Sequence, residues 1–164
     1  MSLGNRALPV AGGAISFSEE TTMDSTIKTK ERTRRRELAG KARKLISESL
    51  PVQDTDESSL MLDYGDFYLQ VAFSELHPLV AIYLARAINR TGTLKDIRLI
   101  NDLNQKSVLG SHTVNTEAGC YSYRAVHWLD TELTQPRFIE ILERSADEAG
   151  RTYNQLMRGS EASA

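Results

Sequence analysis

The stretch 60–73 limits the possible folds more than any other part of this 164-residue chain. Two apolar runs, residues 60–64 and 67–73, are separated only by Gly65 and Asp66. A glycine at the first position of a two-residue loop is what a type II′ turn requires, so the pattern predicts a tight β-hairpin. In the second run apolar and more polar positions alternate, which predicts a sheet with one core face that carries Phe67, Leu69, Val71 and Phe73.

Periodicity and cap residues predict the other elements. Apolar residues recur at helical spacing from Leu38 to Ser49, and this helix should end near Leu50, because Pro51 disfavours a helical residue before it. The run Leu79–Ala87 is almost entirely apolar and follows a proline, which favours a buried strand. The remaining elements are expected to be a helix over 94–105 capped by Thr93, strands over 107–115 and 120–130 joined by a turn at 116–119, and a helix capped by Thr134.

The predicted order is therefore α-β-β-β-α-β-β-α. Such an order indicates the α+β class, an antiparallel sheet with helices packed on it. Hydrophobic residues make up only 40% of the chain, so part of it should lie outside the core. We expect a flexible N-terminal arm over residues 1–30, a single α+β domain over 31–158 and a short C-terminal tail over 159–164. The inner stripe of the last helix is expected to consist of Phe138, Leu142, Ser145, Ala149, Thr152 and Leu156.

Positive charge is concentrated between Lys28 and Lys44. Nine basic and two acidic residues give this stretch a local charge of +7, so the rest of the chain carries −9 within a net charge of −2. A concentrated basic stretch can bind a phosphate-rich partner such as a nucleic acid. The same charges also fit the solvated side of the first helix, which is the interpretation that we favour. The candidate basic patch consists of Arg34, Arg35, Arg36, Lys41, Arg43 and Lys44.

The sequence lacks the standard signatures of catalysis and metal binding. The chain has no GxSxG, HExxH, GxxxxGKS/T or GxGxxG motif, and its single cysteine, Cys120, cannot form an intramolecular disulfide. His112, Cys120 and His127 could ligate zinc only if they converged. In a hairpin centred near Ala118, His112 lies opposite Arg124 and far from His127, so we expect no metal and no cofactor. The longest apolar run has seven residues, too few to span a membrane, and a reducing cytoplasm fits the lone cysteine best.

Two surfaces are candidates for contacts with other chains. The apolar stripe of the second predicted helix, which includes Ile97, Ile100 and Leu103, would form a symmetric homodimer interface or would simply cover the helix's own sheet. Tyrosines on strands can stack against nucleic-acid bases, although they serve more often as packing residues. The candidate partner-binding surface consists of Tyr68, Tyr121 and Tyr123.

Two stretches carry a resemblance to a known family. They are residues 62–69, with the sequence LDYGDFYL, and residues 121–130, which contain YSYRA followed by HWLD. Together with the order of elements, they resemble the bacterial YbjN family, whose fold is similar to that of the class I type III secretion chaperones. The resemblance covers roughly residues 34–157. It implies a small cytoplasmic α+β protein, often dimeric, that holds a peptide segment of a client or acts as a regulator, and it supplies no catalytic residue.

The function that we predict is a non-enzymatic, chaperone-like or regulatory module that binds a client protein or peptide and acts as a homodimer. A partner would complete apolar surface left uncovered, either by strand addition at a sheet edge or by laying its side chains in a groove. One alternative is a nucleic-acid-binding protein that uses the stretch from Lys28 to Lys44. A small hydrolytic or metal enzyme is a third alternative.

Overall fold

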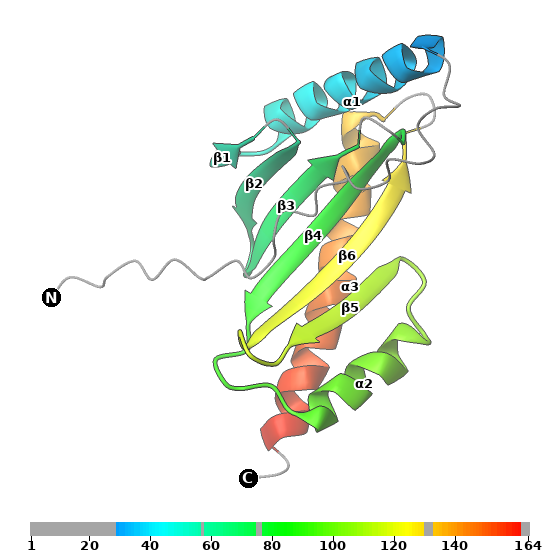
Figure 1. Ribbon diagram of the computed structural model, residues 1–164. Coiled ribbons are helices and arrows are strands. Elements are labelled where there is room, and N and C mark those ends of the chain that lie inside the picture. The colour runs from blue at the N-terminus through cyan, green and yellow to red at the C-terminus, as the bar shows by residue number, and fades with distance from the viewer. Residues whose placement is uncertain (1–28, 57, 75–76, 130–132, 162–164) are drawn as a thin grey trace, which may run out of the picture.

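A computed structural model describes residues 29–56, 58–74, 77–129 and 133–161 of the chain. These residues form a six-stranded antiparallel sheet and three helices, which confirms the predicted α+β class (Figure 1). The strand order is β1-β2-β3-β4-β6-β5. The helices are α1 (Thr29–Ser49), α2 (Leu94–Asn104) and α3 (Gln135–Glu161). The strands are β1 (Asp54–Thr55), β2 (Ser59–Tyr64), β3 (Phe67–Phe73), β4 (Leu79–Ala87), β5 (Gly110–Asn115) and β6 (Cys120–Trp128).

The three helices pack on the same face of the sheet. α3 runs behind the central strands, α1 crosses the end of the sheet where β3 ends, and α2 lies at the opposite end beside β5 (Figure 1). All three contribute to one core, in which α1 buries Ile46, α2 buries Ile100 and α3 buries Phe138. The inner stripe predicted for α3 is confirmed, since all six of its residues are buried. Burial of this stripe is the main force that holds α3 on the sheet.

The β2–β3 hairpin has the predicted turn and alternation. Gly65 has a φ of 58°, a conformation that glycine adopts without steric cost, whereas Asp66 does not share it, as a type II′ turn requires. Along β3 the odd-numbered side chains are buried and the even-numbered ones are half-buried. The sequence does not predict β1, because Asp54 and Thr55 are too few and too polar to give a strand signal.

The β5–β6 hairpin is present, but its register differs by one residue from the predicted one. Asn115 pairs with Cys120 across the four-residue loop 116–119, so His112 lies opposite Tyr123 rather than opposite Arg124. The prediction placed the centre of the turn at a residue, whereas an even-numbered loop places it between two residues. The observed register sets even-numbered residues of β5 beside odd-numbered residues of β6 on the face that packs against the helices.

Some element boundaries also differ from the predicted ones. β5 begins at Gly110 rather than at Ser107, because the Ser107 amide donates to the Leu103 carbonyl at 3.0 Å and continues the turn that ends α2. α1 begins at Thr29, inside the predicted arm, and α3 continues to Glu161, beyond the predicted end of the domain. Residues 1–28 of the predicted arm lie outside the described residues.

Candidate functional site

The face of the sheet opposite the helices consists of every second residue of each strand. These are Asp54 of β1, the odd-numbered residues of β2, β4 and β5 and the even-numbered residues of β3 and β6, which we call the helix-free face. The register aligns them in rows across the sheet, such as the row of Gln70, Tyr83 and Arg124. In the described part of the chain no helix lies over this face (Figure 1).

Apolar and aromatic side chains make up most of the helix-free face. At one end, Val126 is 37% exposed and Trp128, the only tryptophan of the chain, is 67% exposed. Asp54, Asp63 and Arg124 are the charged residues of the face, and Arg124 Cζ lies 5.7 Å from the centre of the Tyr83 ring. Exposed apolar side chains on an open sheet face, such as Val126 and Trp128, are typical of a site for protein–protein interaction.

Side chains close the β5 edge of the sheet. The side-chain amide of Asn104, at the end of α2, accepts a hydrogen bond from the His112 N–H at 2.7 Å and donates one to the His112 carbonyl at 2.9 Å. The Ser107 hydroxyl donates to the Gly110 carbonyl at 2.6 Å. These contacts occupy backbone groups that an added strand would need. Strand addition at this edge would therefore have to displace Asn104 and Ser107.

β1 protects the other edge of the sheet. Its two residues pair with Leu60 and Met61 of β2. Backbone hydrogen bonds continue the pairing on both sides, from the Gln53 N–H to the Met61 carbonyl at 2.9 Å and from the Asp56 N–H to the Ser59 carbonyl at 3.1 Å. A two-residue edge strand offers little backbone for further pairing. Of the two predicted binding modes, side chains laid on a surface therefore fit this structure better than strand addition.

A buried polar cluster lies between β5, β6 and α3. His112 Nδ1 and the Tyr121 hydroxyl oxygen are 2.8 Å apart, and His112 Nε2 lies 3.5 Å from Glu148 Oε1. The Ser107 hydroxyl lies within hydrogen-bond distance of Glu148 Oε1 as well as of the Gly110 carbonyl, so its single proton is shared between them. Burial raises the pKa of Tyr121 above its ordinary range and raises the pKa of Tyr123 to about 12, so both side chains are neutral phenols. The cluster ties β5 and the end of α2 to α3.

We expect the domain to lose stability as the pH falls from about 7.5 to about 5.5. Burial lowers the pKa of His112 below its ordinary value of 6.5, an effect that Glu148 opposes in part, and burial together with Arg137 lowers the pKa of His127. Below pH 6.5 the unfolded chain therefore binds protons on these imidazoles more readily than the folded chain does, and acid favours unfolding. Urea titrations at the two pH values measure the loss. Equal stability at both, or an NMR titration that gives the His112 ring a pKa of 6.5 or higher, would contradict this expectation.

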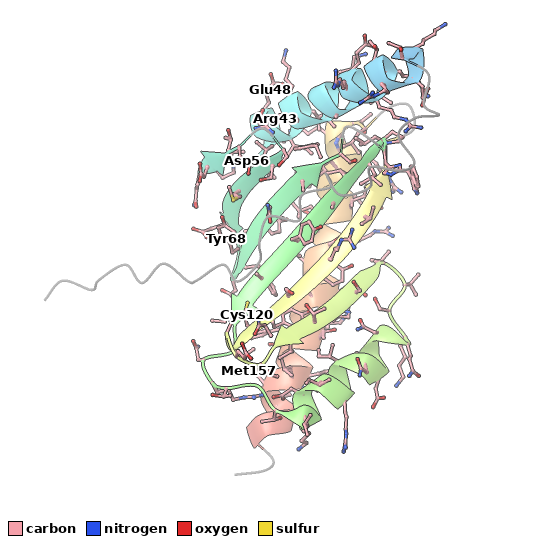
Figure 2. The ribbon with its side chains drawn as sticks, viewed as in Figure 1. Arg43, Glu48, Asp56, Tyr68, Cys120 and Met157 are labelled. Carbon is pink, nitrogen blue, oxygen red and sulfur yellow. The ribbon has the colours of Figure 1, made fainter. Side chains whose placement is uncertain are left out.

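The prediction that Tyr121 and Tyr123 form a partner-binding surface is wrong. Neither has any exposed surface, because the odd-numbered residues of β6 point toward α3. Their rings pack with His112, whose ring centre lies 6.0 Å from that of Tyr121 and 5.0 Å from that of Tyr123. Tyr68 is half-buried and belongs to the helix-free face of β3, so its contact with a partner stays a prediction (Figure 2).

Three residues that shape this site are not among the predicted ones. Val126 and Trp128 supply exposed apolar surface to the helix-free face, and Asn104 closes the β5 edge. Alternation along β6 is a signal for the first two, because His127 and Trp128 must point to opposite faces. No local pattern signals the role of Asn104, since its partner His112 is brought to it by the packing of α2 against β5.

The stripe predicted for a dimer interface is divided between the core and the surface. Ile100 is 3% exposed and packs in the chain's own core, Leu103 is half-buried, and Ile97 is 37% exposed next to Leu94, which is 73% exposed. Ile100 therefore covers its own sheet and is closed to a second copy. An interface through Ile97 and Leu103 stays a prediction.

Most of the predicted basic patch lies on the solvent side of α1. Glu31 lies 3.5 Å from Arg34 and 3.1 Å from Arg35, and Glu48 lies 3.9 Å from Lys44. Pairs of this kind on an exposed helix reduce the net positive charge that a partner meets. The patch residues with exposed side chains are Arg34, Arg36, Lys41 and Lys44.

Arg43 differs from the rest of the patch because it points toward the sheet. Its guanidinium donates a hydrogen bond to the Asp56 carbonyl, and Cζ lies 5.9 Å from the centre of the Phe73 ring (Figure 2). These contacts hold α1 against the end of β3. Arg43 is thus engaged in the fold in a way that the exposed members of the patch are not.

The groups considered for metal binding or catalysis do not converge in the described residues. This part of the chain contains no group of three or more His, Cys, Asp or Glu side chains that could hold a metal ion. His112 lies opposite Tyr123, whereas His127 lies opposite Val80 at the other end of β6 from Cys120. Burial raises the pKa of the Cys120 thiol, which disfavours the reactive thiolate. Across the described ranges no helix is both long and apolar enough to span a membrane.

Two hollows between helices also lack a nucleophile placed beside a base. One, of about 260 Å³, lies between α1 and the start of α3 and is lined in part by Lys44 and Glu48. The other, of about 300 Å³, lies between α2 and the end of α3 and is lined in part by Leu99 and Arg158. Neither lining contains a histidine or a cysteine, so neither hollow places a nucleophile beside an imidazole base.

The comparisons with known proteins identify the fold. No protein-family model matches the chain, and no curated protein matches it. The crystal structure of YbjN from E. coli matches with a TM-score of 0.54 at 8% identity, over 75% of this chain and 91% of that chain. ExsC in the ExsC–ExsE complex matches with a TM-score of 0.54 at 17% identity, over 76% of this chain and 93% of that chain. The chain shares the fold of YbjN and of the type III secretion chaperones.

The resemblance predicted from the residues is thus confirmed for the fold. The HopA1–SchA chaperone–effector complex also matches, with a TM-score of 0.49 at 10% identity, over 80% of this chain and 98% of that chain. At identities this low, the two matches with a TM-score of 0.54 show a common fold and carry over no residue roles. The contacts that a partner would make must therefore be argued from this chain's own surface.

Proposed function

We propose that this chain is a non-enzymatic module that binds a segment of another protein on the helix-free face of its sheet. The observation that carries the proposal is this face itself, a largely apolar sheet surface without a covering helix in the described residues, on a sheet whose edges are partly covered by β1 and by Asn104. Its fold is shared with ExsC, which was solved in a complex with ExsE, and this supports a role in binding a partner protein.

The partner that fits the helix-free face is a segment rich in apolar side chains. Val126 and Trp128 offer exposed apolar surface, and Tyr68 offers a ring and a hydroxyl group. Burial of such surface stabilises a complex by about 25 cal/mol for each Å² removed from water. Asp54, Asp63 and Arg124, the charged residues of the face, sum to a charge of only −1, so the face does not favour a highly charged partner.

We further propose that two copies associate through the exposed side of α2, in the reducing environment of the cytoplasm. Leu94, at 73% exposed, and Ile97 give this side of the helix an apolar surface next to Leu103. α2 and the helix-free face are separate surfaces, so a symmetric dimer would offer each partner-binding face independently. The fold places the sheet edge, closed by Asn104, beside this helix.

Capture of partners from the cells that produce the chain tests the proposed function. The wild-type chain is expected to retain a reproducible protein partner. A chain with Val126→Asp and Trp128→Asp should bind that partner at least about tenfold more weakly, because a charge placed against an apolar segment opposes its burial. The matched control carries Asn154→Asp and Gln155→Asp, which add the same charge at exposed positions of α3, and it should bind as wild type does.

The results of this capture experiment distinguish partner binding on the helix-free face from nucleic-acid binding. Equal binding by both variants, or equal loss in both, would contradict partner binding on the helix-free face. Recovery of nucleic acid in place of protein would support the alternative function, provided that binding weakens steeply with added salt and disappears when Arg34, Arg35 and Arg36 are replaced by Gln.

A further inference from the structure

The centre of the helix-free face is more deeply buried than its end. Ala81 points away from the helices, yet it has no exposed surface, and its partners across the sheet are the small side chains of Ala72 and Val126. The Tyr83 hydroxyl on the same face is also buried, and it has no hydrogen-bond partner. Trp128, at the end of the face, is 67% exposed. Ala81 is flanked along β4 by the larger side chains of Leu79 and Tyr83, so the centre of the face is a shallow apolar floor, beside which the buried Tyr83 hydroxyl has no hydrogen-bond partner.

Residues 1–28 are the part of the chain outside the described ranges that is long enough to reach this floor. The other residues outside the described ranges, 57, 75–76, 130–132 and 162–164, form stretches of three residues or fewer. Residues 1–28 join α1 at Thr29, and α1 crosses one end of the sheet (Figure 1). An extended chain spans at most about 3.5 Å per residue, so residues 18–28 can reach nearly 40 Å, more than the roughly 30 Å length of β4.

We propose that the segment 7–17, with the sequence ALPVAGGAISF, binds to the centre of the helix-free face in the free chain. The segment contains no charged residue, which matches the uncharged alanines at the centre of the face. Its alanines and glycines allow close approach to the shallow floor formed by Ala72, Ala81 and Ala85. Leu8 and Ile15 are large apolar side chains whose burial stabilises the contact.

The bound segment occupies the surface that a client protein would otherwise use. Its binding does not depend on the proposed function, whereas its competition with a client rests on that function. A client that uses the same face must first displace the segment. The apparent affinity for the client is then reduced by the fraction of chains in which the face is free.

Thiol accessibility at position 81 tests the proposal in the full chain. Cys120→Ser removes the natural thiol, and Ala81→Cys places one thiol at the centre of the helix-free face. We expect slow alkylation by a maleimide in this parent chain. The further changes Leu8→Asp, Val10→Asp and Ile15→Asp should raise the rate at least about tenfold, because charges in the segment oppose its burial against an apolar face.

A matched control carries the same added charge outside the segment, at Thr21→Asp, Thr22→Asp and Ser25→Asp, and should alkylate at the parent rate. An unchanged rate in the segment variant overturns the proposal, and so does an equal rise in the control. A synthetic peptide of residues 7–17, added to the segment variant, should restore slow alkylation, and failure to do so also counts against the proposal. No client takes part in the assay, so its failure leaves the proposed function untouched.

Discussion

Gly110→Ala is expected to lower the free energy of unfolding by at least about 3 kcal/mol. Gly110 opens β5, and a Cβ added there would clash with the carbonyl oxygen of Arg124 and lie 2.7 Å from the Tyr123 ring. Neither neighbour can shift without a large cost in free energy, because the carbonyl belongs to the backbone of β6 and Tyr123 is fully buried. The strain must therefore be relieved by opening the start of the β5–β6 pairing.

Gly150→Ala provides the matched control for this prediction. Gly150 lies within α3, and no neighbouring atom lies within 4 Å of an added Cβ. Alanine favours a helix over glycine by about 0.5–1 kcal/mol, so this variant should be slightly more stable than wild type. Urea unfolding of the three proteins measures both effects. A Gly110→Ala chain within about 1 kcal/mol of wild type would show that the close approach at β5 does not hold in solution.

Asp96→Ala should have the next largest effect, a loss of about 3 kcal/mol near neutral pH. The Asp96 carboxylate is 5% exposed and accepts hydrogen bonds from both terminal nitrogens of Arg90, at 2.7 and 2.9 Å. It also accepts from the Thr93 N–H at 2.8 Å and the Thr93 hydroxyl at 2.9 Å, which completes the capping box of α2. The substitution removes the ion pair and half of the cap together.

The effect of Asp96→Ala should shrink in acid. The hydrogen bond with Arg90 is the main reason that the pKa of Asp96 falls from 3.8 to about 2. A carboxyl with a lowered pKa contributes stability above its unfolded value of 3.8 and loses that contribution as the pH falls toward 2. The difference in unfolding free energy between wild type and variant should therefore decrease by about 2 kcal/mol over this range.

Asp102→Ala is the control for the pH series. Asp102 lies on the same helix and is exposed, so its replacement should change stability by less than about 0.5 kcal/mol at any pH. If the Asp96→Ala difference were the same at pH values above and below its titration, the ion pair with Arg90 would not be the source of the stability.

The structure joins these local features to the proposed binding role. Asp96 and Gly110 fix α2 and β5, and Asn104 then closes the sheet edge between them. The surface that remains for a partner is the helix-free face, where Val126 and Trp128 are exposed. The same face is where the segment 7–17 is proposed to bind, so partner binding and self-covering would compete for one surface.

Local periodicity was enough to predict most of the fold. The alternation along β3 and the glycine at position 65 predict the first hairpin, and the apolar stripe from Phe138 to Leu156 predicts α3 together with its buried side. A short stretch of sequence contains these signals, because side chains return to the same side every two residues in a strand and every 3.6 residues in a helix. The order of elements, which resembles that of YbjN, follows from the same short stretches of sequence.

Only the tertiary structure determined which residues form the candidate site. A loop of even length shifted the β5–β6 register by one residue and set His112 beside Tyr123, and the packing of α3 buried Tyr121 and Tyr123, which the sequence offers equally as surface residues. The short β1 and the amide of Asn104 close the sheet edges through partners that are distant along the chain. The sequence thus determined which residues form each element and which side of each is apolar. Which apolar side faces a helix, and which stays available to another chain, depends on long-range pairing that no local pattern encodes.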